Sequence, residues 1–180
     1  MQKIKPINIE NHKFMIHPLR QQDMSRISQI ENELFEILHD NESTKYIEGG
    51  RLPNRNAISD RMFGIIMGYQ TGQSYSHFIT DKRTMSVIGM VDIISPARAR
   101  EIYTLDKYNW MITYFLHKEF WGQGIIPGVV NAICQNIKSQ GINTIAAICD
   151  RENIRSIRVL EKVGFHKTMS FDIKQDYFEI

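Results

Sequence analysis

Apolar residues at intervals of three and four positions predict a helix near the N-terminus of the chain. A short apolar run, Phe14–Leu19, precedes it and is expected to form a strand. Between the two lies Asp23, whose carboxylate is expected to cap the helix. The apolar positions of this helix are Ile27, Ile30, Leu34, Ile37 and Leu38. One face is therefore apolar and should pack on a sheet.

A second helix follows after a polar stretch that contains Gly49–Gly50 and Pro53. Asn54 is expected to cap it, and Gly72 marks its end. Its apolar positions are Ile58, Met62, Ile66 and Tyr69. The N-terminal part of the chain is thus predicted to hold one strand and two helices.

The middle of the chain has the pattern of an antiparallel hairpin. Ser76–Asp81 and Ser86–Ile94 are rich in β-branched and aromatic residues, and a polar turn connects them. The next segment, Ser95–Lys107, is polar, and we interpret it as a loop.

In the C-terminal half strands and helices alternate, and glycines at Gly141 and Gly164 suit helix C-termini. The elements are a strand over Trp110–Leu116, a helix over Pro127–Gln140, a strand over Ile142–Cys149 and a helix over Ile154–Val163. This alternation predicts a βαβα unit with a parallel strand pair. The last segment, Phe171–Ile180, is expected to leave a strand edge that can pair with another subunit, so the protein is a monomer or a homodimer. We predict a single α/β domain with a mixed sheet over residues 1–180.

Composition excludes several classes of protein. The 180 residues are 42% hydrophobic and 23% charged, with 22 basic and 20 acidic side chains, so neither disorder nor a nucleic-acid partner is predicted. No apolar run is long enough to cross a membrane, and no export signal is expected. Cys134 and Cys149 lie in apolar surroundings without metal-ligand spacing, and the six histidines are scattered. We expect buried thiols, no metal and a cytoplasmic location.

The segment Trp121–Gly128 carries the strongest chemical signal. Its glycines lie between a predicted strand and a predicted helix, where exposed backbone N–H groups and the helix dipole bind phosphate. A plain strand-to-helix turn has the same pattern. A P-loop is excluded because no Lys-Ser/Thr pair follows the glycines. A dinucleotide fold would use Gly122, Gly124, Gly128 and Asp150, but too few residues remain for its other βαβ units.

Two linked segments resemble the GNAT superfamily of N-acetyltransferases, closest to its RimJ/RimL-like branch of ribosomal-protein N-acetyltransferases. The first runs from Tyr114 to Gly124, and the second, Asn153–Phe165, is similar to the signature N-x-x-S-x-x-V-L-E-K-x-G-F. The N-terminal half resembles the family more loosely. The resemblance implies a GNAT-like fold and acetyl-CoA as co-substrate.

For the coenzyme, the resemblance implies that backbone N–H groups bind its pyrophosphate. These groups belong to Trp121, Gly122, Gln123, Gly124 and Ile125. Phe115 and Leu116, near the end of the preceding strand, would pair with the pantetheine amides, and a family-like bulge in that strand would direct one N–H at the thioester oxygen. The first position of the family's phosphate motif is Glu119 here, which is a departure.

Asn153 and Ser156 have both a structural and a chemical interpretation. Asn153 is expected to cap the following helix by accepting from the Ser156 N–H, and by resemblance it also contacts pantetheine. Many relatives protonate the departing thiolate with a tyrosine that corresponds to Leu160, so Ser156 is the better candidate here. Arg155 and Arg158 are interpreted as a solvated helix face, although they could approach the 3′-phosphate of the coenzyme.

The group that accepts the amine's proton is not identified by the sequence. Some relatives carry a glutamate at the position of Met111. The alternative carboxylates are Asp92, Glu101, Asp106 and Glu119. Tyr114 could orient a water in a relay, and an amine that arrives neutral needs no base.

The sequence therefore predicts an N-acetyltransferase that moves an acetyl group from acetyl-CoA to a primary amine by direct attack in a ternary complex. The acceptor is a protein N-terminus or a small-molecule amine. Two alternatives remain open at this point: a non-catalytic acyl-CoA-binding sensor or interaction module and, with weaker support, a dinucleotide-binding protein.

Overall fold

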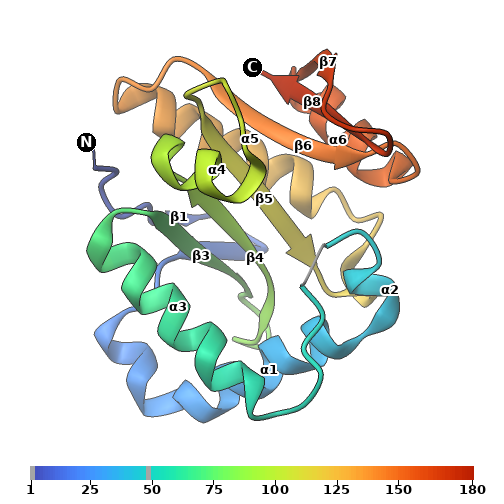
Figure 1. Ribbon diagram of the computed structural model, residues 1–180. Helices are drawn as coiled ribbons and strands as arrows, with labels where there is room; N and C mark the ends of the chain where they lie inside the picture. The colour runs from blue at the N-terminus through green and yellow to red at the C-terminus, as the bar shows by residue number, and fades with distance from the viewer. Residues whose placement is uncertain (1–2, 48–49) are drawn as a thin grey trace.

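An eight-stranded mixed sheet in the order β1-β2-β3-β4-β5-β6-β8-β7 runs through the molecule (Figure 1). The computed structural model describes residues 3–47 and 50–180, so Gly49 lies outside the described residues. The strands are β1 (Ile9–Glu10), β2 (Phe14–His17), β3 (Ser74–Asp81), β4 (Val87–Ile94), β5 (Trp110–Leu116), β6 (Ile145–Asp150), β7 (His166–Ser170) and β8 (Gln175–Glu179). Among the described strands, β5 and β6 are the one pair that runs in parallel. The predicted mixed α/β fold is confirmed.

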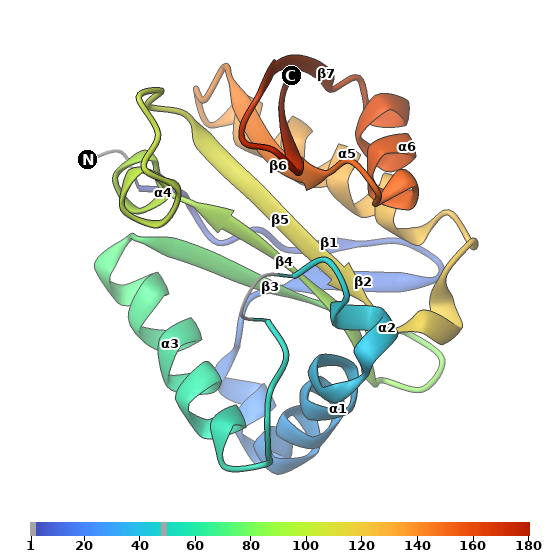
Figure 2. The same cartoon turned by 45° about the vertical axis from the view of Figure 1, so that its right-hand side comes forward.

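Helices cover both faces of this sheet (Figures 1 and 2). One face carries α1 (Ile27–His39) and α3 (Ala57–Thr71), and the other carries α5 (Ile125–Ser139) and α6 (Ile154–Val163). The short elements are η1 (Gln21–Arg26), α2 (Asn41–Thr44), α4 (Pro96–Tyr103) and η2 (Lys118–Phe120). Within the described residues, none of the helices combines the length and the apolar character that a membrane span requires.

Two large apolar clusters, one on each side of the sheet, hold the layers together. Ile30, Leu34 and Met62 of the α1–α3 layer pack with Phe78 and Met90 of the sheet. The cluster on the other face is larger and joins α5 and Leu160 of α6 to the strands. Each large apolar side chain buried in this way contributes about 1.5–3 kcal/mol. The alternation of strand residues thus assigns each side chain to one face of the sheet, and a third, smaller cluster joins Ile94, Met111, Ala146 and Tyr177 to α4.

Three details of the N-terminal half differ from the sequence prediction. Asp23 does not cap α1: it lies in η1, is buried, and accepts from the Arg20 N–H and guanidinium. The side chain of Asn54 does accept from the Ala57 N–H, but the residue before the helix is Asn56. In α3 the side chain of Ile65 is buried and that of Ile66 is exposed, because Ile65 lies on the helix face that is turned toward the sheet.

The segment predicted as a loop, Ser95–Lys107, contains a helix. Ser95 precedes α4, and its Oγ accepts from the Arg98 N–H, while Pro96 occupies the first turn. Proline is favoured there because its missing N–H has no helical partner in any case. The Ser-Pro pair was therefore the signal for this helix.

At the C-terminus the open edge belongs to a different strand from the one predicted. The segment Phe171–Ile180 contains β8, which pairs with β6 on one side and with β7 on the other. The edge strand is β7, and all five of its residues are exposed. The prediction failed because β8 lies between β7 and β6. Its pairing with β6 joins segments that are far apart in the sequence.

Candidate active site

The parallel strands β5 and β6 separate soon after they begin (Figures 1 and 2). They pair only through Trp110 with Ile145 and Met111 with Ala146. On its other side β5 pairs with β4 along its whole length without a register shift, so the bulge expected in β5 is absent from this ladder. Beyond Met111, one edge of β5 therefore has no strand partner.

The glycine-rich turn after β5 presents a row of unpartnered backbone N–H groups. Gly122 and Gly124 have φ of 74° and 72°, a conformation that favours glycine, and α5 begins directly after them. In the described part of the chain, the N–H groups of residues 122–126 have no acceptor. A Cβ built on either glycine would meet no atom within 4 Å. The positive end of the α5 dipole lies at the same place, so the turn is suited to an anion.

The Trp121 side chain links this turn to both β5 and α6. Its indole Nε1 donates to the Leu116 carbonyl over 2.8 Å. The Arg155 guanidinium lies 4.4 Å from the centre of the indole ring, in a cation–π contact. Arg155 and Arg158 are both exposed, as predicted for a solvated helix face, but Arg155 also has a specific position beside the turn.

At the start of α6, Asn153, Ser156 and Tyr114 form a connected polar group. The Asn153 side chain accepts from the Ser156 N–H over 3.2 Å, which confirms the predicted cap. The Tyr114 hydroxyl lies 2.8 Å from Ser156 Oγ, so β5 and α6 are linked across the region where β5 and β6 have separated. Burial raises the pKa of the Tyr114 phenol well above its usual value, so the phenol stays protonated.

The other predicted positions lie in the apolar cores. The Phe115 side chain belongs to the cluster under α1 and α3, and Leu160 is buried in the cluster under α5 and α6. Met111 has no exposed surface and lies among apolar neighbours. Neither Met111 nor Leu160 can exchange a proton, so the acid and the base must be other groups.

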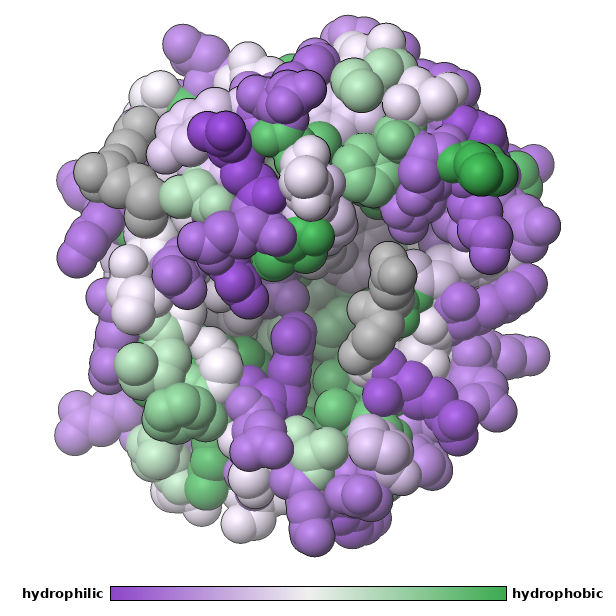
Figure 3. Space-filling view, in the orientation of Figure 1, coloured by the Kyte–Doolittle hydropathy of each residue, from purple (hydrophilic) through white to green (hydrophobic). Residues whose placement is uncertain are grey.

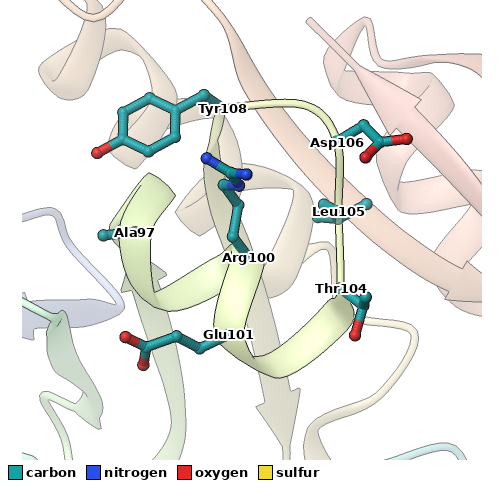
Figure 4. Close-up of a pocket in the computed structure, with 7 residues that line it drawn as sticks. All are labelled: Ala97, Arg100, Glu101, Thr104, Leu105, Asp106 and Tyr108. Atoms are coloured by element: carbon teal, nitrogen blue, oxygen red, sulfur yellow. The ribbon is translucent and has the colours of Figure 1, made fainter.

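Three of the four alternative carboxylates lie on the outer surface. Glu101 forms an exposed ion pair with Arg98, and Glu119 is exposed. Asp106 lines a surface pocket beside α4, together with Glu101 (Figure 4). The pocket lies before the start of β5, and the glycine turn lies after its end. The seven residues of this strand, about 20 Å long, therefore separate the pocket from the turn.

The fourth carboxylate, Asp92, lies on the central strand β4. Its side chain is 15% exposed and contacts Arg61 of α3 and Ser76 of β3. On this side of the molecule the surface is hollowed where β5 passes through the centre of Figure 1 (Figure 3). Among residues 3–47 and 50–180, no group of three or more His, Cys, Asp or Glu side chains is arranged to hold a metal ion.

A comparison with protein-family models identifies one match. Residues 14–166 match the model described as Acetyltransferase (GNAT) domain. A search of curated protein sequences gave no significant match.

Solved structures share the whole fold at low sequence identity. A GNAT-family acetyltransferase from Bacillus anthracis has 16% identity and a TM-score of 0.68, over 97% of this chain and 98% of that one. The ribosomal-protein-S5-alanine acetyltransferase from Vibrio fischeri has 17% identity and a TM-score of 0.69, over 97% and 96%. The microcin C7 self-immunity acetyltransferase MccE, solved with acetyl-CoA and AMP, has 16% identity and a TM-score of 0.70, over 94% and 93%.

Proposed function

The chain belongs to the GNAT acetyltransferase family and is an N-acetyltransferase, and on this premise we propose that it acetylates a primary amine by direct attack in a ternary complex. This membership decides against the sensor and the dinucleotide-binding alternatives. One observation carries the assignment of the coenzyme site: unpartnered N–H groups at the start of α5 adjoin the unpaired edge of β5. Acetyl-CoA supplies the activated thioester when bound.

The turn at residues 122–125 binds the pyrophosphate through its main chain, whereas the Trp121 N–H, which the resemblance implied as a further donor, donates to the Lys118 carbonyl over 3.1 Å. The backbone N–H groups of Gly122, Gln123, Gly124 and Ile125 have no other acceptor, and the open space at both glycines lets phosphate oxygens approach. Because the contact is made by backbone atoms, the departure at Glu119 leaves it unchanged. Arg155, held against Trp121, adds a positive charge beside the site.

The unpaired edge of β5 pairs with the pantetheine arm as an additional strand would. The Leu116 carbonyl and the Trp121 indole lie on this edge, and the His117 N–H bonds to Ile88 on the opposite side. Backbone groups alternate along a strand, so those of Tyr114 point to the same edge as Leu116 and those of Phe115 point to β4. Tyr114 and Leu116 therefore supply the pairing groups, Phe115 holds the strand in place, and the Asn153 side chain flanks the arm.

Ser156, hydrogen-bonded to Tyr114, protonates the departing thiolate. The protonated amine first loses one proton, and its nitrogen lone pair then attacks the thioester carbon. The new C–N bond forms as the C–S bond breaks, and the electron pair of the C–S bond goes to sulfur. A second proton leaves the nitrogen and one proton is delivered to sulfur, so the products are the amide, the free thiol and one proton released to solvent.

The buried thiols support direct attack rather than an acetylated cysteine. Cys149 lies close to Ser156, but burial raises its pKa, and burial raises the pKa of Cys134 to about 12. The thiolate is the nucleophilic form of cysteine, and little of it is present in either residue near neutral pH. An amine that reaches the thioester directly needs no such intermediate.

The acceptor is a protein N-terminus or a small-molecule amine. Similar structures include one described as a ribosomal-protein-serine acetyltransferase and one described as a ribosomal-protein-S5-alanine acetyltransferase, which supports the first class. MccE was solved with AMP beside acetyl-CoA, which supports the second class. The free cysteines are compatible with a reducing cytoplasm.

A matched pair of glycine substitutions tests the coenzyme site. Gly124→Trp fills the open space at the turn, whereas Gly64→Trp places the same side chain in open space on α3. We expect Gly124→Trp to weaken acetyl-CoA binding by roughly 100-fold or more, because a well-placed phosphate site contributes several charge-assisted hydrogen bonds of about 1.5–3 kcal/mol each. Gly64→Trp should bind within about twofold of the unmodified protein by calorimetry. Equal affinity in all three proteins would contradict the assignment.

A further inference from the structure

The two central strands β4 and β5 are buried almost throughout, and their few partly exposed residues lie together. In β4 the partly exposed residue is Asp92, and in β5 the partly exposed residues are Thr113 and Tyr114. Asp92 and Thr113 are direct cross-strand partners. The centre of a covered sheet is normally apolar and dry, so a carboxylate that reaches solvent there is unusual.

Asp92 is the middle of a polar row that crosses three strands. Ser76 of β3 is its cross-strand partner on one side and Thr113 of β5 on the other. The Ser76 hydroxyl donates to Asp92 Oδ1, and Arg61 Nη2 of α3 donates to Oδ2 over 3.0 Å. The Arg61 Nε is buried and has no partner among the described residues. The carboxylate is thus held by its neighbours from two directions.

The row faces the α1–α3 side of the sheet, because Met90 and Phe115, two positions away along their strands, pack in the cluster under those helices. Tyr114 points to the opposite side, where its hydroxyl meets Ser156 of α6. The unpaired edge of β5 separates these two sides. The hollow in Figure 3 lies over β5 on the face of the sheet that carries α1 and α3. Asp92 is one strand away from that edge, a spacing of about 5 Å between neighbouring strands.

From this arrangement we infer that Asp92 is the residue that receives the ammonium group of the acceptor, and that Arg61 and Ser76 position its carboxylate. The inference rests on the proposed function, because the thioester must lie along the unpaired edge of β5. The amine then enters through the hollow, on the side of the sheet opposite to Ser156. The two substrates meet where β5 and β6 have separated.

The role of Asp92 in the proton transfer follows from this position. The ammonium donates a hydrogen bond to the carboxylate and transfers one proton to Asp92, which frees the nitrogen lone pair. Asp92 returns that proton to water in the hollow. The lone pair then forms the C–N bond as the C–S electron pair leaves with sulfur. The second proton leaves the nitrogen through Asp92 to water, Ser156 delivers a proton to sulfur and regains one from water, and one proton is released in total, so the balance given above is unchanged.

The local charge also limits the class of acceptor. Among the described residues, the polar row of Ser76, Asp92 and Thr113 holds one carboxylate, and the guanidinium of Arg61 lies directly beside it. A polycation would place a second positive charge near Arg61 without a partner, and like charges at short distance repel each other. The site therefore favours an acceptor with one ammonium group over a polyamine.

Asp92→Asn tests the inference, and Arg61→Gln tests the positioning of the carboxylate. Both substitutions remove the ion pair between α3 and β4, but only Asp92→Asn removes the carboxylate. The assay follows thiol release from acetyl-CoA with propylamine, alaninamide and spermidine as acceptors. Calorimetry with acetyl-CoA and thermal unfolding are measured on the same three proteins.

We expect Asp92→Asn to lower kcat/KM for the mono-amines by roughly 100-fold or more, the usual range for a proton acceptor at the reacting nitrogen. Its acetyl-CoA affinity should stay within about twofold of the unmodified protein. Arg61→Gln should lower kcat/KM by about tenfold, less than Asp92→Asn, because the carboxylate remains but loses the residue that positions it. It should also raise turnover of spermidine relative to propylamine because a positive charge is removed.

Two outcomes would overturn the inference, and they are distinguishable from failure of the proposed function. If Asp92→Asn and Arg61→Gln lose activity and thermal stability to the same degree, Asp92 only ties α3 to the sheet. If Asp92→Asn retains the rate and the pH profile of the unmodified protein, the amine is received elsewhere. An unmodified protein that binds no acetyl-CoA, or that acetylates none of the amines, would contradict the proposed function itself, and the role of Asp92 would fall with it.

Discussion

The two sides of β5 differ in the atoms that they offer to a substrate. On the coenzyme side the groups are backbone N–H donors from one short segment, residues 122–126, whose placement depends on two glycines. On the acceptor side they are the side chains of Ser76, Asp92 and Arg61, which come from two strands and a helix. Backbone donors persist when neighbouring side chains change, as at Glu119. A site built from side chains can change its substrate by substitution, so a common coenzyme site is compatible with varied acceptors.

Ser156→Ala should produce the largest effect among the variants that test this contrast, because Ser156 is the proposed proton donor to the sulfur at which the C–S bond breaks. Without the hydroxyl, the departing thiolate loses its proton donor, and kcat should fall by roughly 100-fold. The KM for acetyl-CoA should change by less than about threefold, since the cap of α6 is contributed by Asn153 rather than by this hydroxyl. Steady-state kinetics with alaninamide measures both quantities, and Ser139→Ala on α5 is the control.

The pH dependence of the unmodified enzyme sharpens the same prediction. Burial raises the pKa of Tyr114, so its phenol stays protonated up to and beyond its ordinary value near 10. The hydrogen bond to Ser156 is therefore retained as the pH rises. Below about pH 10, kcat of the unmodified enzyme should show no decrease caused by ionisation of Tyr114, so Tyr114→Phe should abolish no such decrease. A decrease near pH 8 that disappears in Tyr114→Phe would show that the phenol ionises during turnover.

A smaller effect is expected from Arg155→Gln, which tests whether the coenzyme side also uses a side chain. The guanidinium over Trp121 adds one positive charge beside the turn, so its removal should weaken acetyl-CoA binding by about five- to tenfold at low salt and less at high salt. Arg158→Gln, on an exposed position of the same helix, should leave the affinity within about twofold. Equal losses in the two variants would indicate a general electrostatic effect of α6.

The smallest expected changes are in the free energy of unfolding. They distinguish the effect of backbone strain from the effect of lost contacts with acetyl-CoA. Gly124 and Gly164 both have positive φ, so alanine at either position should lower the free energy of unfolding by about 1 kcal/mol. Gly64→Ala, in the interior of α3, should raise it by up to about 1 kcal/mol. Urea unfolding measures these values. Only Gly124→Ala should also weaken acetyl-CoA binding, and a similar loss in Gly164→Ala would mean that strain alone explains the effect.

The elements that local sequence predicted best are those with their own start and stop signals. Two elements have the predicted bounds: the strand Trp110–Leu116 and the helix Ile154–Val163. The strand is a run of residues that favour β structure and ends at polar residues, and the helix is flanked by Asn153 and Gly164. The helix α4 was missed because it is short and polar, although Ser95 and Pro96 mark its start. The insertion of β8 between β6 and β7 has no local signal, since strand order depends on contacts between distant segments.

The same distinction applies to the site. Gly122 and Gly124 were found because a phosphate-binding turn is a local structure with a local spacing. Arg155 is exposed, as the sequence predicts, but helical periodicity does not tell that the Trp121 indole lies beneath its guanidinium. Asp92 was one of four equivalent carboxylates in the sequence, and its position on β4 distinguishes it from the other three.

The sequence alone determined the family, the coenzyme turn and the cap of the last helix, because each depends on residues a few positions apart whose backbone geometry is set locally. The tertiary structure decided which strand edge is left unpaired, which side of the sheet each polar side chain faces and which charges meet. Those features arise when segments separated by tens of residues pack against each other, and the packing energy of the whole core selects them.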